Sequence, residues 1–329
     1  MDTNNSSFQE IPIIDIFSLL GVNDNPKSVR KTRKEIEDAC KNIGFFYVKN
    51  HQIPQNHLDA VISVMEEFFN LPQEEKMKIH IGKSAIFRGY TPLGKELTND
   101  KYDWHECVDF GLDLHSNHPS VIKGEQLVGY NQWPENLPNF KKVMERHWKL
   151  MILLGRRITE GLAMSLGLER NYFAPFMSKS HSFMRILNYP PFGKLQDENL
   201  GDGIGAHIDY GFLTILHQDN IGGLEVKNVE NEWISAPTIQ GTFLINIGHM
   251  IQRWTNDHYK ATVHRVIPPE HETRCSLPFF FEPNFDTVVV PLDEFCSRDN
   301  PPRYEPLHFG DYIERRFTTS YSDTINSFT

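Results

Sequence analysis

The segment GAHIDYGFLTIL, residues 205–216, carries the pattern from which both the fold and the chemistry of this chain can be inferred. It is a β-prone and largely apolar run in which His207 and Asp209 stand two residues apart. Because successive side chains of a strand alternate between its two faces, the imidazole and the carboxylate should point the same way. A carboxylate that faces a protein interior is unfavourable unless a cation accompanies it. The segment therefore predicts an inward-facing site that holds a cation.

A third possible ligand lies further along the chain, where His264 stands in the β-type run ATVHRVI. Two neutral imidazoles and one carboxylate, with adjacent coordination positions left open, form the ligand set of non-haem Fe(II) oxygenases. The His-x-Asp tripeptide is common in unrelated proteins, so the hypothesis needs independent support. The other histidines are expected to be surface or hydrogen-bonded residues, among them His105, His181, His217, His249 and His258.

Support comes from a later β-type run that begins with Arg274, Cys275 and Ser276. Alternation places Arg274 and Ser276 on one face, followed on that side by Pro278 and Phe280. A guanidinium grips a carboxylate through two charge-assisted hydrogen bonds, and a neighbouring hydroxyl can add a third. In isolation this arginine would be interpreted as a surface residue beside a turn. Together with the predicted metal site, it indicates an anchor for an acidic co-substrate.

Short β-type runs at hairpin-like spacing dominate the chain after residue 180. They predict a mainly β protein with α elements, built as a sandwich or jelly roll. The preceding part should pack against it as a helical region. It contains strands at 11–16, 44–51 and 104–112, helices at 28–44, 57–72 and 140–166, and a loop-rich stretch at 81–135. Gly44 and Pro72 should end the first two helices, and a helical tail at 309–321 should cover the barrel.

Composition narrows the class of protein. The 329 residues carry a formal net charge of −10, which weighs against nucleic acid or another polyanion as a partner. The apolar run LMILL at 150–154 is too short to cross a bilayer, and the polar N-terminus is unlike a secretory peptide. Four scattered cysteines form no CxxC pair, so neither a disulfide framework nor a zinc knuckle is expected. We expect a cytoplasmic monomer with no membrane partner.

The chain resembles the isopenicillin N synthase-like branch of the Fe(II)/2-oxoglutarate dioxygenases over nearly its full length. The segments that carry the resemblance occur in the family's order: IPIIDI, GFFYVKNHQIP, RGYTPLGKE, NQWP, AHIDYGFLTIL, GGLEV, FLINIGHMIQRWTND, YKATVHRV and RCSLPFFFEPN. Their ordered co-occurrence is far more specific than any one of them. The resemblance implies a double-stranded β-helix (jelly roll, cupin-like) core with iron at its mouth. It also implies an N-terminal region at 1–135, a scaffold helix at 136–179, the β-core at 180–295 and a tail at 296–329.

Site roles follow from the resemblance position by position. His207, Asp209 and His264 match the iron ligands of the family. Arg274 and Ser276 match the residues that bind the distal carboxylate of 2-oxoglutarate, a tyrosine that often assists them matches Tyr189, and a phenylalanine beside the metal matches Phe280. Two positions depart from the pattern: Leu187 stands where plant members often have Asn, and His249 stands where many relatives have Asp. We expect His249 to be structural or solvent-facing.

The resemblance also implies the reaction. Fe(II), 2-oxoglutarate and O₂ would together oxidise a C–H bond of a small molecule, with release of succinate and CO₂. Hydroxylation, desaturation and oxidative ring closure remain open, because enzymes with each outcome share these motifs. Residues 81–135 and the tail are candidates for lids.

The strand that holds Tyr189 gives an indication of the substrate. If Tyr189 points inward, alternation turns Phe183, Arg185 and Leu187 inward as well. Our hypothesis is that Arg185 pairs with a carboxylate of a small acidic substrate, with Phe183 and Phe280 as an apolar wall. The alternative is that Arg185 pairs with a protein acid at the barrel rim. Arg88 is a second candidate cation.

Three other functions remain open at this level. The first is an oxidase of the same fold that consumes no 2-oxoglutarate, as isopenicillin N synthase and aminocyclopropanecarboxylate oxidase do. The second is a non-catalytic relative that binds a ligand or a partner protein. The third, a cupin-like metal protein with other chemistry, would not explain Arg274 and Ser276.

Overall fold

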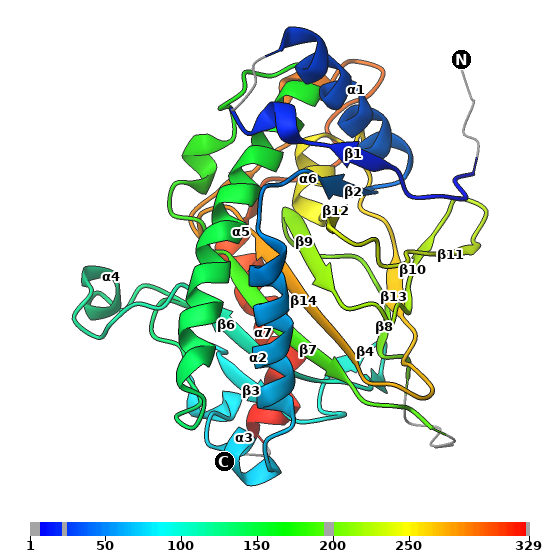
Figure 1. Ribbon diagram of the computed structural model, residues 1–329. Coiled ribbons are helices and arrows are strands. Elements are labelled where there is room, and N and C mark those ends of the chain that lie inside the picture. Colours follow the sequence, from blue (N-terminus) through cyan, green and yellow to red (C-terminus); the bar gives the residue numbers. More distant parts are fainter. Residues whose placement is uncertain (1–6, 22–24, 194–200, 327–329) are drawn as a thin grey trace.

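The core of the protein consists of two facing β-sheets, as seen in the computed structural model, which describes residues 7–21, 25–193 and 201–326 (Figure 1). The large sheet has the strand order β1-β2-β12-β9-β14-β7-β6-β3, and the small sheet the order β11-β10-β13-β8. Strands within the two sheets pair antiparallel, except that β1 runs parallel to β2. This arrangement is the jelly roll that the spacing of β-type runs predicted.

The strand bounds are as follows. The large sheet contains β1 (Ile13–Asp15), β2 (Phe45–Lys49), β3 (Gly89–Thr91), β6 (Glu106–Gly111), β7 (Phe183–Tyr189), β9 (Leu213–Gln218), β12 (Thr242–Ile247) and β14 (Arg274–Phe281). The small sheet contains β8 (Ile204–His207), β10 (Leu224–Lys227), β11 (Trp233–Ser235) and β13 (His264–Val266). Two-stranded sheets are formed by β4 (Leu97–Thr98) with β5 (Lys101–Tyr102), and by β15 (Val288–Val289) with β16 (Leu307–His308).

Helices cover the outer face of the large sheet. The helices of the structure are α1 (Pro26–Asn42), α2 (Gln55–Phe69), α3 (Gln73–Met77), α4 (Pro119–Ile122), α5 (Pro138–Ser165), α6 (His249–Trp254) and α7 (Phe309–Asn326). Short 3₁₀ turns add Phe17–Leu19, Ile81–Lys83, Ala174–Met177 and Asp293–Phe295. The long α5 lies alongside α2 in Figure 1, with the strands behind them. Among the described helices, none is both long and apolar enough to cross a membrane.

Local sequence explains where the first helix begins and ends. Asn25 accepts a hydrogen bond from the Lys27 N–H, and Pro26 occupies the first turn, where its missing N–H is not needed. At the other end Gly44 has φ +76° and donates to Ala39 O, as predicted for a C-cap. A side chain there would also meet Lys260 O at 2.3 Å. Gly44 therefore fixes the turn from α1 into β2.

Two apolar clusters lie on either side of the large sheet. The larger one fills the space between the sheet and the helices, and includes Phe68, Trp148, Ile215 and Phe279. The smaller one lies between the two sheets, where Tyr47, Leu187 and Val266 are among its members. The inner cluster leaves one end of the barrel open to a cavity.

The long elements occur where the sequence predicted them, but one detail of the opening segment was wrong. The strand β8 ends at His207, so Asp209 lies beyond it rather than within it. The partner strand β13 begins opposite His207, and the carbonyl of Asp209 instead accepts a hydrogen bond from His249 N at the start of α6. The regions proposed at 1–135, 180–295 and 296–329 include residues 1–6, 22–24, 194–200 and 327–329, which lie outside the described part.

Candidate active site

Three side chains converge at the open end of the barrel. His207 and His264 are direct register partners on β8 and β13, and their rings lie 4.3 Å apart. Asp209 Oδ1 lies 3.5 Å from His207 Nε2 and 3.6 Å from His264 Nε2. The Nδ1 atoms of the two rings face the carbonyls of Gly205 and Thr262. Each Nε2 is therefore left to bind a metal, with the tautomer fixed by a backbone carbonyl.

The Asp209 carboxylate is oriented by hydrogen bonds to its other oxygen. Thr214 Oγ1 and Asn246 Nδ2 donate to Oδ2 at 2.5 and 2.6 Å, which leaves Oδ1 to face the two imidazoles. Gly211, two residues after Asp209, leaves the space that the Glu282 carboxyl occupies, since a Cβ atom there would lie 1.6 Å from Glu282 Oε1. The arrangement presents one carboxylate oxygen, together with two ring nitrogens, to a single point.

Electrostatics suit a divalent cation. Burial raises the pKa of the Asp209 carboxyl, but His264 and His207 outweigh burial and bring that pKa well below its usual range. Burial lowers the pKa of His264 to about 4, which favours the neutral imidazole that a metal requires. Two imidazoles and a carboxylate on one side of a point fit the ligand set of Fe(II) oxygenases.

A buried arginine lies deeper in the same cavity. Arg274 is 1% exposed, and its Nη1 and Nη2 donate to Ser276 Oγ and Gln218 Oε1, both at 3.1 Å. Its Cζ lies 4.7 Å from the ring centroid of Tyr189. Neither Arg274 Nε nor Tyr189 Oη has a hydrogen-bond partner, and among the described residues Arg274 forms no ion pair. A dicarboxylate such as 2-oxoglutarate would supply the missing counter-ion.

The cavity between the two groups has a volume of about 180 Å³. The inward residues of β7 line it as alternation predicted: Phe183, Arg185, Leu187 and Tyr189. On β14 the lining residues are Arg274, Ser276, Pro278 and Phe280. The Phe183 and Phe280 rings stack 4.3 Å apart and form the expected apolar wall.

Arg185 does not have the partner that we hypothesised. Its Nε and Nη2 donate to the two oxygens of Asp109 at 2.8 and 2.9 Å, and Nη1 donates to Glu96 Oε2 at 2.8 Å. Both carboxylates belong to the protein. The hypothesis that Arg185 pairs with a substrate carboxylate is therefore wrong, and the alternative, pairing with an acid of the protein, is confirmed. Asp109 stands directly opposite Arg185 on β6, which makes the forked ion pair possible.

Arg88 is also not a pocket cation. Its guanidinium is buried and donates to the carbonyls of Leu112, Leu127 and Gly129. It lines a different cavity of about 690 Å³, which is separated from the first by Phe183 and Phe317. We therefore assign Arg88 a structural role.

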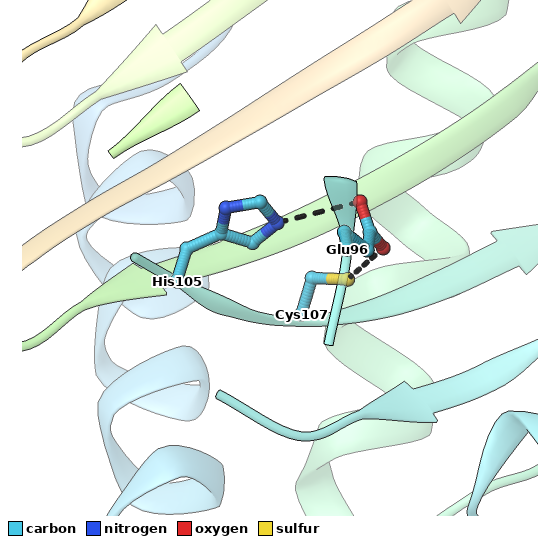
Figure 2. A group of neighbouring side chains, drawn as sticks. All are labelled: Glu96, His105 and Cys107. Atoms are coloured by element: carbon cyan, nitrogen blue, oxygen red, sulfur yellow. Dashed lines mark hydrogen bonds and ion pairs between the residues drawn. The ribbon is translucent and has the colours of Figure 1, made fainter. Parts of the chain in front are cut away.

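Beside Arg185 lies a second cluster of possible metal ligands, shown in Figure 2. Glu96 Oε1 accepts from Cys107 Sγ at 3.2 Å, and His105 Nε2 lies 3.4 Å from Glu96 Oε2. Arg185 already donates to that same Oε2, so a metal here would have to displace a guanidinium. Burial also raises the pKa of the Cys107 thiol well above its usual range, which opposes a thiolate ligand. We interpret the cluster as an ion-paired wall of the cavity.

In and beside this cluster, the carboxyl groups outnumber the groups that can carry a positive charge. Burial raises the pKa of Glu96, but Arg185 and His105 outweigh it and lower that pKa to about 2. Burial raises the pKa of Asp109 to about 6 and also raises that of Asp103. Burial lowers the pKa of His105, but Glu96 and Asp103 more than compensate and raise it. We call Glu96 and Asp103, which both line the cavity, the acidic wall.

Several residues of the cavity were missed by sequence reasoning. Glu96 and Asp103 come from loops, where no periodicity marks them, and His105 lies in the predicted strand 104–112 but was expected to be a surface or hydrogen-bonded residue. Glu282 lies behind Gly211, and burial raises its pKa well above the usual range. Ile313, Arg316, Phe317 and Ser320 reach the cavity from α7, in the tail predicted to cover the barrel. His249 does not line the cavity and is half-buried near Tyr304 and Tyr312.

Comparison with known proteins agrees with this geometry. Residues 11–136 match the family model described as the N-terminal part of the non-haem dioxygenase in morphine synthesis, and residues 181–283 match the 2OG-Fe(II) oxygenase superfamily. A homoarginine-6-hydroxylase of Glycine max is 38% identical over 97% of this chain and 99% of its own length. A probable iron/ascorbate oxidoreductase of Dictyostelium discoideum is 39% identical over 98% of both chains.

A solved structure shows the same fold. A full-length Neurospora crassa protein, in complex with alpha-KG and thymine, superposes with a TM-score of 0.82 at 26% identity, over 98% of this chain and 99% of that chain. The sequence relatives, the fold and the converging ligand set point to one conclusion. The chain belongs to the Fe(II)/2-oxoglutarate-dependent dioxygenases and is an oxidoreductase that uses Fe(II) and 2-oxoglutarate.

Proposed function

We propose that this chain hydroxylates a small metabolite that carries a positively charged amino or guanidino group. In this proposal His207, Asp209 and His264 hold Fe(II). Arg274, Ser276 and Tyr189 bind the distal carboxylate of 2-oxoglutarate. The overall reaction consumes the substrate, 2-oxoglutarate and O₂, and it yields the hydroxylated substrate, succinate and CO₂.

Each group of residues in the cavity has a separate role in this reaction. Bound Fe(II) would supply the oxidation of the C–H bond, driven by decarboxylation of 2-oxoglutarate. Thr214 and Asn246 keep Asp209 Oδ1 directed at the metal position. The stacked Phe183 and Phe280 exclude water from one side of the cavity. The polar groups of the cavity that bind neither Fe(II) nor 2-oxoglutarate then set the position of the substrate relative to the iron.

The observation that carries the proposal is the charge of the acidic wall. Asp109 neutralises Arg185 through a forked ion pair, so Arg185 leaves no positive charge for a substrate. Arg185 also donates to Glu96, but its single charge cannot balance both Asp109 and Glu96. Glu96 and Asp103 both line the cavity, and among the described residues beside them His105, whose pKa both raise, is the remaining group that can carry a positive charge. Even a protonated His105 balances one of the two carboxylates. A cationic group on the substrate would complete the balance, and a buried charge is favourable only when it is balanced.

The relatives support the same class of substrate. Homoarginine-6-hydroxylases from Glycine max, Oryza sativa and Arabidopsis thaliana are 35–38% identical to this chain over nearly its full length. Homoarginine carries a guanidinium and also a carboxylate, so the expectation of a carboxylate-bearing substrate is kept. What changes is the residue that would bind this carboxylate, because Arg185 is already paired.

The test is turnover with a matched pair of substrates. Purified protein with Fe(II), 2-oxoglutarate and O₂ is given L-homoarginine or L-homocitrulline, in which a neutral urea replaces the guanidinium. We expect succinate release and a product heavier by one oxygen atom with homoarginine, and much less with homocitrulline. Succinate release should require added 2-oxoglutarate, which separates the proposal from an oxidase that does not consume it.

The variant Asp103→Asn checks the role of the acidic wall. Asn keeps the shape of the side chain that contacts Thr98 and Gly205 but removes its charge. The preference in kcat/KM for homoarginine over homocitrulline should fall about tenfold, as expected for one charge-assisted contact. Glu225→Gln is the matched control, because Glu225 pairs with Arg265 outside the cavity. A wild-type protein that turns over homocitrulline as well as homoarginine would refute the cationic substrate.

A further inference from the structure

We propose that Arg316, on the C-terminal helix α7, binds the carboxylate of the substrate and thereby determines specificity. The inference rests on the function proposed above and deepens it, because it adds a carboxylate to the features expected of the substrate. It also makes α7 a part of the active site rather than only a cover for the barrel.

Position is the first reason. Arg316 lines the same cavity as the candidate iron ligands, beside Phe317, which follows it on α7. The helix is held over the barrel by Phe309 and Ile313, which are both buried in the larger apolar cluster. Arg316 itself remains exposed, so a ligand in the cavity can reach it.

The second reason is that no carboxylate in the described part of the chain pairs with Arg316. The other guanidiniums in the cavity are already accounted for, because Arg185 pairs with protein acids and Arg274 faces the site proposed for 2-oxoglutarate. Arg316 forms no ion pair with a carboxylate in the described part of the chain, and its hydrogen bond is to Tyr312 Oη at 3.4 Å. Among the described residues that line the cavity, it is the arginine left available for a substrate carboxylate.

The third reason is the way the guanidinium is held. Its Cζ lies 4.1 Å from the ring centroid of Tyr210 and 5.4 Å from that of Tyr312. Stacking on an aromatic face uses the flat side of a guanidinium and leaves N–H groups at its edge for a planar, forked contact with a carboxylate. Tyr210 directly follows Asp209, so this contact ties Arg316 to the position of a candidate iron ligand. The cation is therefore placed in advance, which reduces the entropy lost on binding.

The same cavity thus presents charges of both signs. The acidic wall comes from the β4 loop and the approach to β6, whereas Arg316 comes from α7. A molecule with a cation at one end and a carboxylate at the other can contact both groups at once. A free amino acid with a basic side chain has this distribution of charge.

Binding calorimetry without O₂ tests the inference apart from catalysis. Protein loaded with Mn(II), a redox-inert substitute for Fe(II), and with 2-oxoglutarate is titrated with carboxylic acids, each beside its own carboxamide. The probes are L-homoarginine, L-lysine and phenylpropionate. We expect at least one acid to bind wild-type protein about tenfold more tightly than its amide. In Arg316→Gln that preference should disappear, through weaker binding of the acid alone, and Arg316→Lys should keep part of it.

The neighbouring arginine provides a matched control. Arg315 is exposed, its Nε donates to the Asp311 carbonyl on its own helix, and it does not line the cavity. Arg315→Gln should therefore bind every probe as the wild type does. Titration with 2-oxoglutarate alone confirms that each variant keeps the loaded site.

The outcomes separate the two proposals. If Arg316→Gln binds the acids as tightly as the wild type, or if no acid is preferred to its amide, the role of Arg316 is refuted even when homoarginine is a substrate. If phenylpropionate binds through Arg316 while homoarginine and lysine do not bind, the inference about Arg316 stands. The cationic substrate class then fails.

Discussion

Arg185 and Arg274 lie on neighbouring antiparallel strands and line one cavity, yet their charges are balanced in opposite ways. Arg185 contacts two carboxylates of the protein, Asp109 and Glu96. Arg274 is more deeply buried, and within the described part of the chain its side chain donates to the neutral partners Ser276 and Gln218 while its Nε has no partner. A buried cation is unfavourable without a counter-ion. The protein supplies the counter-ions of Arg185 from its own sequence, whereas we propose that a ligand supplies the counter-ion of Arg274.

The largest effect should come from removing the paired arginine. Arg185→Met keeps much of the length of the side chain but removes the cation between Asp109 and Glu96, of which Glu96 keeps a possible cationic partner, His105, among the described residues. Removing one partner of a buried ion pair typically costs about 3–5 kcal/mol of stability. Urea unfolding at neutral pH should therefore show a loss of this size relative to the wild type.

A second variant shows whether the loss comes from the uncompensated charge. Arg185→Met combined with Asp109→Asn removes the partner of the forked contact as well, and it should regain a large part of the lost stability. If the double variant is no more stable than Arg185→Met, lost packing rather than charge explains the effect. The contrast between the two arginines would then be wrong.

Removing the unpaired arginine should instead weaken ligand binding. In Arg274→Gln the dissociation constant of 2-oxoglutarate should rise about 100-fold, equivalent to about 3 kcal/mol, because a forked contact to a buried carboxylate is lost. Without ligand the variant should be as stable as the wild type or more stable, since an unbalanced buried charge has been removed. Calorimetry on the Mn(II)-loaded protein and urea unfolding without 2-oxoglutarate measure the two quantities.

Arg253→Gln serves as the control for this variant. Arg253 lies on α6 and donates to the Glu305 carbonyl, away from the cavity. Its loss should leave the affinity for 2-oxoglutarate unchanged. An Arg274→Gln protein that binds 2-oxoglutarate normally, or that loses several kcal/mol of stability without ligand, would show that Arg274 is structural.

The sequence predicted the direction of these side chains but not the partners of Arg185. Alternation along a strand is a local property, so it correctly turned Arg185 and Arg274 into the barrel. The partners of Arg185 come from distant parts of the chain, a loop residue, Glu96, and a residue of another strand, Asp109. Only the pairing of β6 with β7 brings Asp109 opposite Arg185, and pairing between distant strands is not encoded in local periodicity.

The same reasoning explains the error at Asp209. A period-two pattern continues through residues 205–209, so nothing in the local sequence indicates that β8 ends at His207. The partner strand β13 does not extend beyond His207, and the Asp209 carbonyl bonds to His249 N, a contact with a helix that is distant in sequence. The three candidate ligands still converge, because the side chain of Asp209 is held by Thr214 and Asn246 rather than by strand geometry.

Three buried histidines extend this comparison, because at low pH they would become buried cations without counter-ions. His57 on α2, His147 on α5 and His217 on β9 lie in a row on the outer side of the large sheet, with ring centroids 5.5 and 6.5 Å apart. In the part of the chain that the structure describes, neither ring nitrogen of His147 has a hydrogen-bond partner, nor do His57 Nε2 and His217 Nδ1. Burial lowers the pKa of all three, to about 4 for His217.

Their effect on stability has a definite sign. A histidine with a lowered pKa in the folded state contributes stability that is fully present above its unfolded value of about 6.5 and is lost as the pH falls toward about 4. For His217 alone, the free energy of unfolding should fall by about 2 kcal/mol between pH 7 and pH 5. The variant His217→Phe should lack this contribution. Its free energy of unfolding, measured with urea at pH 7 and at pH 5, should therefore decrease less than that of the wild type. If the free energy of unfolding decreases equally in both proteins, protonated His217 already has a partner in the folded state. A buried cation in this fold would then not always need a ligand or an acid beside it.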